Sequence, residues 1–303
     1  MVTDLQGNRL HGANGAAARF FDQAIDAFSV YRGDPVALLD QALLEAPGFA
    51  LAGVVKGWLL ALATEPAATA AARELVAALP LDGLDGRTRS LLAALETLLA
   101  SGWTNAALRL DHHNAEYPRD LFALQAGHLV DFFRAGSRSL RDRIARALPF
   151  WSPDQPGYAV LLGMYAFGLE ETGAYAAAED AGRHALDLDP RDCWAHHAVA
   201  HVMEMQGRPQ DGIGWMIARE PHWAGADNVF KVHNWWHRAL WHLELGQIDE
   251  VFALYDGPIR EQRSSVALDL VDAASLLWRI ELCGHDVGDR WQELAEAWRP
   301  QVD

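Results

Sequence analysis

The sequence predicts an all-α protein built from helical hairpins, and three observations support that class. Alanine and leucine, both good helix formers, dominate the 303 residues. Alternating runs of β-branched residues, which are typical of strands, are lacking. Glycines recur at the period of a helical hairpin: Gly173 and Gly207 are 34 residues apart, Gly246 follows 39 residues later and Gly284 a further 38.

The same spacing divides the chain into eight helix pairs of a tetratricopeptide-like α-solenoid. The best single unit, residues 157–190, has small residues at Ala166, Ala178 and Ala185 and a closing Pro190, as a tetratricopeptide repeat has. Each repeat needs its neighbours to bury its apolar face, so we expect one continuous domain over residues 1–303 with a concave groove. The expected pairs are 16–44, 49–79, 87–116, 120–148, 156–186, 192–217, 228–254 and 264–298.

Charge and composition narrow the classes of partner. The chain has 41 acidic and 25 basic residues and a formal net charge of −16, which repels nucleic-acid phosphates and anionic lipid headgroups. Its two cysteines are too few for a disulfide framework, and its first residues have no basic cluster followed by an apolar stretch. We therefore expect an acidic, cytoplasmic protein with no nucleic-acid or membrane partner, and the sequence leaves its oligomeric state open.

Histidines are concentrated in two of the expected first helices, in the repeats 192–217 and 228–254. His197 and His201 are four residues apart and Glu204 follows three residues later, so one helix face carries all three. His233 and His237 are likewise four residues apart. On adjacent helices about 10 Å apart, His197 and His237 lie at nearly equal heights, and their side chains are expected to converge.

Two long segments around these histidines, AHHAVAHVMEMQGR and HNWWHRALWHLELG, resemble the family of tetratricopeptide repeat protein 38, as do the N-terminal segments DLQGN, GDPVALLDQAL and PGFALA. The likeness runs over most of the chain and implies the repeat fold, but no particular reaction. In tetratricopeptide arrays five positions of the first helix face the groove. His237 is not at one of these positions but is the residue next to one of them, Trp236. These positions correspond here to Trp194, His197, His201, Glu204 and Met205, and to His233, Trp236, Leu240, Leu243 and Glu244.

Three interpretations of the histidine pattern stay open. The first is a divalent-metal site for zinc, iron or manganese held by His197, His201, His233 and His237. An open ligand position on such an ion favours a hydrolase or lyase. The second is metal-free acid–base catalysis, in which Glu204 orients His201. The third is a non-catalytic scaffold whose groove binds a peptide or a protein.

The composition of the groove favours the enzyme, because peptide-binding grooves rely on Lys, Arg and Asn. Here the expected groove has few cations and many aromatic side chains, which suit a small organic substrate. No GxSxG, P-loop, HExxH or paired CxxC motif is present. The catalytic candidates are His197, His201, Glu204, His233 and His237, and the substrate-binding candidates are Trp194, Trp236, Phe167, Glu244 and His113.

Overall fold

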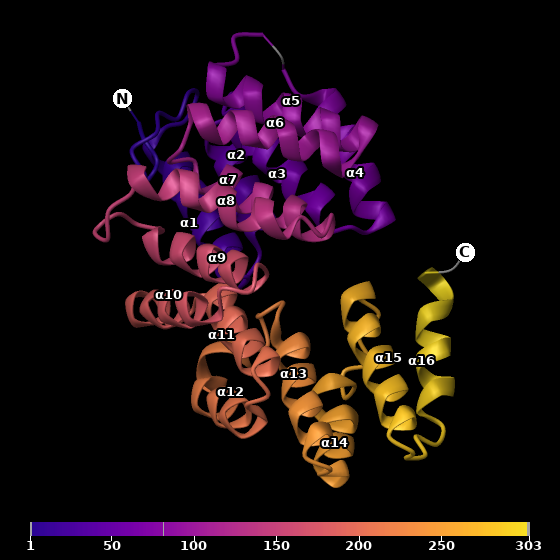
Figure 1. Ribbon diagram of the computed structural model, residues 1–303. Coiled ribbons are helices and arrows are strands. Elements are labelled where there is room, and N and C mark those ends of the chain that lie inside the picture. Colours follow the sequence, from indigo (N-terminus) through magenta and orange to yellow (C-terminus); the bar gives the residue numbers. More distant parts are fainter. Residues whose placement is uncertain (1, 81, 302–303) are drawn as a thin grey trace. The chain divides into compact units, whose positions relative to one another are not determined.

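The computed structural model describes residues 2–80 and 82–301, and over these residues the chain is all-helical (Figure 1). Sixteen α-helices account for most of this part of the chain, and it contains no strand. The predicted all-α class is confirmed. None of the described helices is long and apolar enough to cross a membrane.

The helix bounds follow the eight expected pairs closely. The largest difference is at α12, which ends at Trp223 and not near residue 217. The first five pairs are α1 (Gly15–Ser29) with α2 (Pro35–Glu45), α3 (Ala50–Leu62) with α4 (Pro66–Ala78), α5 (Gly86–Ser101) with α6 (Trp103–Glu116), α7 (Leu121–Phe133) with α8 (Ser137–Ala147), and α9 (Tyr158–Glu170) with α10 (Tyr175–Leu188). The last three are α11 (Cys193–Met205) with α12 (Pro209–Trp223), α13 (Lys231–Glu244) with α14 (Ile248–Leu254), and α15 (Ala267–Leu282) with α16 (Arg290–Trp298).

The chain divides into two compact units, one up to Val199 and one from Ala200 onward. The first unit contains α1 to α10 and the beginning of α11, and the second contains the rest. The boundary falls inside α11 and not in a loop. The single continuous domain expected from the repeats stays a prediction.

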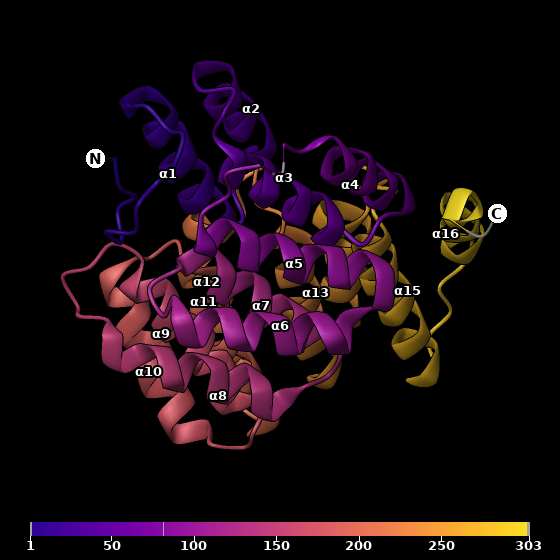
Figure 2. The ribbon, with the colours of Figure 1, turned by 90° about the horizontal axis from the view of Figure 1, so that it is seen from above.

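A buried ionic network ties the N-terminal segment of the first unit to α5, α6 and the start of α7. Of these helices, α5 and α6 lie side by side in Figure 2. Arg87 of α5 contacts Asp4 at 2.9 Å and Asp120, at the start of α7, at 2.6 Å. Asp120 also contacts Nε2 of His113, on α6, at 3.1 Å. Because a buried charge is costly unless it is paired, this network fixes how these segments meet.

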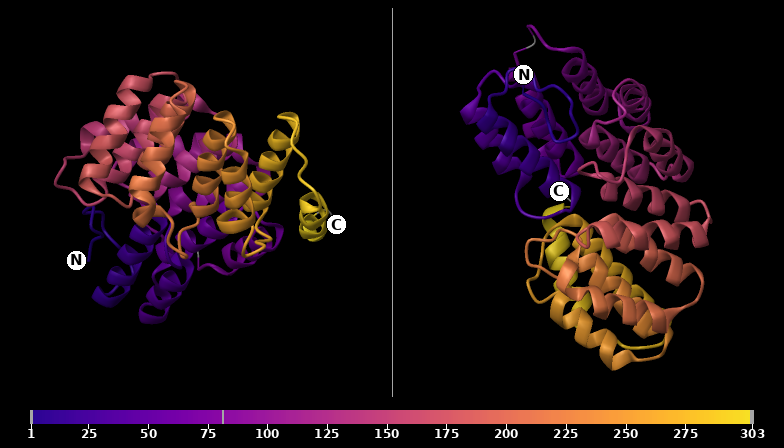
Figure 3. Two further views of the ribbon diagram at one scale, coloured as in Figure 1. Left: turned by 90° about the horizontal axis from the view of Figure 1, so that it is seen from below. Right: turned by 90° about the vertical axis from the view of Figure 1, so that its left-hand side faces the viewer.

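In the second unit, α13 packs against α12, α14 and α15, and the helices from α13 to α15 lie side by side in Figure 3. One face of α13 contributes Val232 and Ala239 to an apolar core. That core also contains Leu270, Leu276 and Leu277 of α15 and Val251 and Leu254 of α14. Trp236 and Leu240, which share a helix stripe with His233 and His237, also pack against this core.

Candidate metal centre

The first pair of candidate histidines is placed by α11. This helix begins after Asp192, whose Oδ1 accepts a hydrogen bond from the backbone N–H of Ala195 at 2.9 Å. The helix is continuous, so His197 and His201, four residues apart, lie one turn from each other on one face. Their relation therefore follows from the helix itself, although the unit boundary separates the two residues.

The second pair is placed by α13. Asn228 lies just before this helix, and its side-chain oxygen accepts a hydrogen bond from the N–H of Phe230 at 2.8 Å. His233 and His237 then lie one turn apart on the helix. His237 is buried, with 4% of its surface exposed, and His233 is half-buried.

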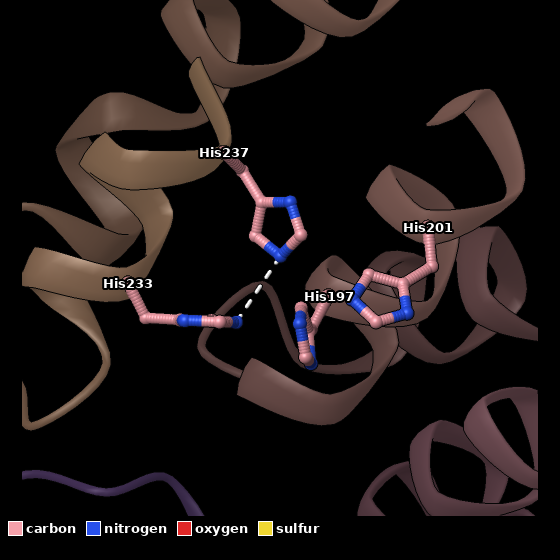
Figure 4. Close-up of side chains that lie close together, drawn as sticks. All are labelled: His197, His201, His233 and His237. Atoms are coloured by element: carbon pink, nitrogen blue, oxygen red, sulfur yellow. Dashed lines mark hydrogen bonds between the residues drawn. The ribbon is translucent and has the colours of Figure 1, made fainter. Parts of the chain in front are cut away.

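The four imidazoles converge, as Figure 4 shows. Nε2 of His237 lies 3.1 Å from Nε2 of His233, and the ring centres of His201 and His237 are 4.9 Å apart. One ring nitrogen from each of His197, His201, His233 and His237 lies within 4.8 Å of the other three. The convergence predicted from the two i, i+4 pairs is confirmed, including that of His237.

The spacing of these nitrogens suits a divalent ion. Zn–N bonds of about 2.0–2.1 Å in a tetrahedral site put the ligand nitrogens about 3.3 Å apart. The His233–His237 pair at 3.1 Å already has nearly that separation. The remaining ligand nitrogens all lie within 4.8 Å of one another. The residues therefore fit a metal ion with imidazole ligands.

Asp272 of α15 sets the tautomer of one ligand, and the sequence analysis did not identify it. Its Oδ2 lies 3.0 Å from Nδ1 of His233. An ionised carboxylate only accepts hydrogen bonds, so Nδ1 of His233 carries the hydrogen and Nε2 presents its lone pair toward His237. This carboxylate–histidine arrangement is the one that orients histidine ligands in metal sites.

Two aromatic side chains expected to contact a substrate instead stack on the histidines. Trp236 lies nearly parallel to His233, with ring centres 5.3 Å apart and planes at 18°. Phe167 stacks on His197 at 5.3 Å and 16° within the first unit, and it is fully buried. Both contacts restrict rotation of the imidazoles. The predicted substrate contacts of Trp236 and Phe167 stay predictions.

Glu204 lies beside the histidine group and is not a member of it. The residue lines a cavity of about 320 Å³ in the second unit together with Glu244 and Arg279. Burial raises the pKa of the Glu204 carboxyl, and the charge of Glu244 raises it further. Among the described residues, the group that could hold a metal ion does not include Glu204, and the predicted catalytic role of Glu204 stays a prediction.

Two of the other predicted substrate-binding residues are buried in the first unit. Trp194 has 1% of its surface exposed and packs edge-on against His128 with ring centres 4.6 Å apart. His113 is fully buried against Asp120. Neither ring presents a solvent-facing surface, so core packing accounts for both positions, whereas Glu244 is exposed and lines the cavity with Glu204.

No protein-family model matches this sequence. The resemblance to the tetratricopeptide repeat protein 38 family stays a prediction, and the geometry of the histidine group carries the functional argument.

Proposed function

We propose that this protein is a metal-dependent enzyme of hydrolase or lyase type that acts on a small organic molecule. The observation that carries the proposal is the convergence of His197, His201, His233 and His237, with Asp272 behind His233. The proposal includes a tetratricopeptide-like superhelix whose concave groove contains the site.

The donor set favours zinc or iron among the ions considered. Imidazole nitrogens suit zinc, copper, iron and nickel, whereas manganese prefers carboxylate and carbonyl oxygens. Four neutral ligands leave the full charge on a divalent ion, which would polarise a substrate carbonyl and make a water molecule more acidic. For a catalytic role, a substrate group would enter as a fifth ligand beside the four histidines, since zinc can expand to five-coordinate.

The cavity beside the histidines supplies the other parts of a reaction. Its apolar wall is formed by Leu240 and Leu243, and Arg279 offers a cation for a polar substrate group. The raised pKa of Glu204 moves its protonation closer to neutral pH, where a carboxyl group both accepts and returns a proton efficiently. In this scheme Glu204 is the general acid and base, and burial together with the charge of Glu244 keeps its pKa raised.

A metal-free acid–base site is the second candidate, and one contact favours it. The 3.1 Å separation of the His233 and His237 Nε2 atoms also fits a hydrogen bond from His237 to His233. Asp272, His233 and His237 would then form a relay that holds a proton at His237. The scaffold interpretation has no comparable contact in its favour.

Metal binding and hydrolysis together test the proposal. Chelator-treated protein is dialysed against zinc and measured by inductively coupled plasma mass spectrometry, and the hydrolysis of para-nitrophenyl acetate is followed before and after reloading. We expect about one zinc ion per chain and chelator-sensitive hydrolysis in the native protein. Both are expected to disappear in His237→Ala and His201→Ala.

The matched control is His285→Ala, because His285 is an exposed histidine of the same unit that lies outside the group. This variant is expected to bind zinc and to hydrolyse the ester as the native protein does. Hydrolysis that resists chelation yet fails in His237→Ala would contradict the metal and support the metal-free relay. Zinc bound equally by all four proteins would contradict the site.

A further inference from the structure

A second cavity, in the first unit and separate from the histidine group, has the features of a ligand site. It has a volume of about 330 Å³, within the range of small-molecule pockets. Its walls come from the N-terminal segment, α1, the start of α9 and the loop before α11. Two hydrogen-bonded contacts hold these walls together: Gln6 Nε2 donates to the Pro156 carbonyl at 3.1 Å, and Arg191 binds both carboxylate oxygens of Asp26 at 3.0 Å.

One face of α1 forms a wall of the cavity and presents an unsatisfied hydroxyl. Asp22, Ile25, Asp26 and Ser29 all line the cavity, and their spacing puts them in one stripe along the helix. Ser29 is only 2% exposed, and its Oγ has no hydrogen-bond partner among the described residues. A buried hydroxyl without a partner is costly, and a ligand in the cavity would supply one.

The N-terminus of α9 also lines the cavity. No side chain caps this helix. Within the described chain, the backbone N–H groups of Ala159 and Val160, both lining the cavity, have no acceptor. Free N–H groups at the start of a helix, together with the helix dipole, favour a carboxylate or another anion.

Asp22 makes the cavity suitable for a cation as well. Its Oδ1 accepts a hydrogen bond from the N–H of Leu5 at 3.2 Å. Burial raises the pKa of its carboxyl to about 6, because its charge is poorly compensated. Asp26 and Asp189, in contrast, share the guanidinium of Arg191. A ligand ammonium group beside Asp22 would supply the missing positive charge.

We infer that this cavity binds a small zwitterion, a free amino acid or a short peptide, with its carboxylate at the N-terminus of α9, its ammonium group at Asp22 and Ser29 bonded to one of them. The inference does not depend on the histidine group, since every wall of the cavity lies in the first unit.

Thermal shift with the twenty free amino acids and with glycyl dipeptides, followed by calorimetric titration of the best probe, tests this inference on the full chain. The free zwitterion is expected to bind at least tenfold more tightly than its N-acetyl or its C-terminal amide derivative. Ser29→Ala is expected to weaken binding at least fivefold with almost no change in Tm of the ligand-free protein, since the hydroxyl bonds to no described residue.

Asp22→Asn keeps an oxygen that accepts from Leu5 and is expected to lose the preference for a free amine. Asp187→Asn, an exposed aspartate of α10 outside the cavity, is the control and should bind as the native protein does. The inference is overturned if no probe binds. It is overturned equally if the N-acetyl derivative binds as tightly as the free amine, or if Ser29→Ala and Asp22→Asn bind like the control.

Discussion

At the scale of single residues, the helical period accounts for what the sequence revealed of the site. Histidines four residues apart must share a helix face, so the pairs on α11 and α13 were predicted from spacing alone and are confirmed. Sequence spacing predicted that Glu204 lies on the same helix face as His197 and His201. How far its carboxylate lies from the four ring nitrogens depends on side-chain conformations, which sequence spacing does not determine. The stacking of Trp236 on His233 also depends on side-chain conformations and could not be predicted from spacing.

Asp272 is the residue of the site that was not predicted from the sequence. It belongs to the next helix pair and has no acidic or histidine neighbour at i+4 that would mark it as part of a motif. One signal was available: Asp272 lies 12 residues before Gly284, and His233 lies 13 residues before Gly246. The two positions differ by one residue in this register, and neighbouring positions of adjacent first helices lie close together in a repeat array.

Removal of the Asp272 carboxylate is expected to weaken metal binding without breaking the group. Asp272→Ala should raise the Kd for zinc by about 10- to 100-fold, because His233 loses the acceptor that fixes its tautomer. Asp272→Asn should lose less, since its amide oxygen still accepts from Nδ1. Competition with a chromophoric chelator gives the Kd values.

Asp269, one turn earlier on α15, serves as the control for that measurement, because its carboxylate bonds to Ser264 and is not part of the histidine group. Asp269→Ala is expected to bind zinc as the native protein does. Equal Kd values for Asp272→Ala and Asp269→Ala would show that Asp272 has no part in the site.

At the scale of the helices, turn glycines made the element boundaries predictable. Gly207 and Gly246 have φ of +60° and +69°, the left-handed region that glycine adopts without strain. After each, a backbone bond closes the helix end, from Arg208 N–H to the Met203 carbonyl and from Gln247 N–H to that of His242, both at 2.9 Å. These turns end α11 and α13 just beyond the histidines.

The first unit is harder to divide from its sequence, because three of its corresponding turns lack glycine at the position that follows the first helix. Tyr31, Thr64 and Ala135, which follow α1, α3 and α7, have φ of 55°, 60° and 54°. Side chains in this region cost conformational energy, and tertiary packing must offset it. The regular glycine spacing is therefore clear only from Gly173 onward, and the helix pairs before it were predicted by extending the same spacing outward.

Two glycines of α12 give a test of how α12 positions α13. A Cβ at Gly212 would lie 2.5 Å from the ring of the fully buried Trp241, whereas Gly214, one helix face away, is exposed with open space around it. Gly212→Ala is expected to lower the free energy of unfolding by roughly 1–3 kcal/mol through overpacking.

Gly214→Ala is the matched variant, and it should leave stability unchanged or raise it by up to about 1 kcal/mol, since alanine is the better helix former. Urea unfolding of the two variants against the native protein decides the point. Destabilisation of the same size in both would contradict the close α12–α13 packing.

At the scale of the whole molecule, the repeat pattern predicted the class and the order of the helices, but not the division into two units inside α11. The repeat period of the sequence indicates which apolar face each helix pair buries against its neighbour. It does not indicate where the packing between successive pairs becomes weaker or changes. The acidic net charge of −16 is a property of the complete chain and bears on its partners, not on its fold. The site itself is local: it depends on α11, α13 and α15.

X-ray absorption at the zinc edge, on the zinc-loaded full chain, tests the central claim most directly. The account predicts nitrogen ligands at about 2.0–2.1 Å and the outer-shell scattering of at least three imidazole rings, with the same spectrum in the control variant His285→Ala. Oxygen ligands alone, or a sulfur ligand at about 2.3 Å from a cysteine, would contradict it and place the metal away from the four histidines.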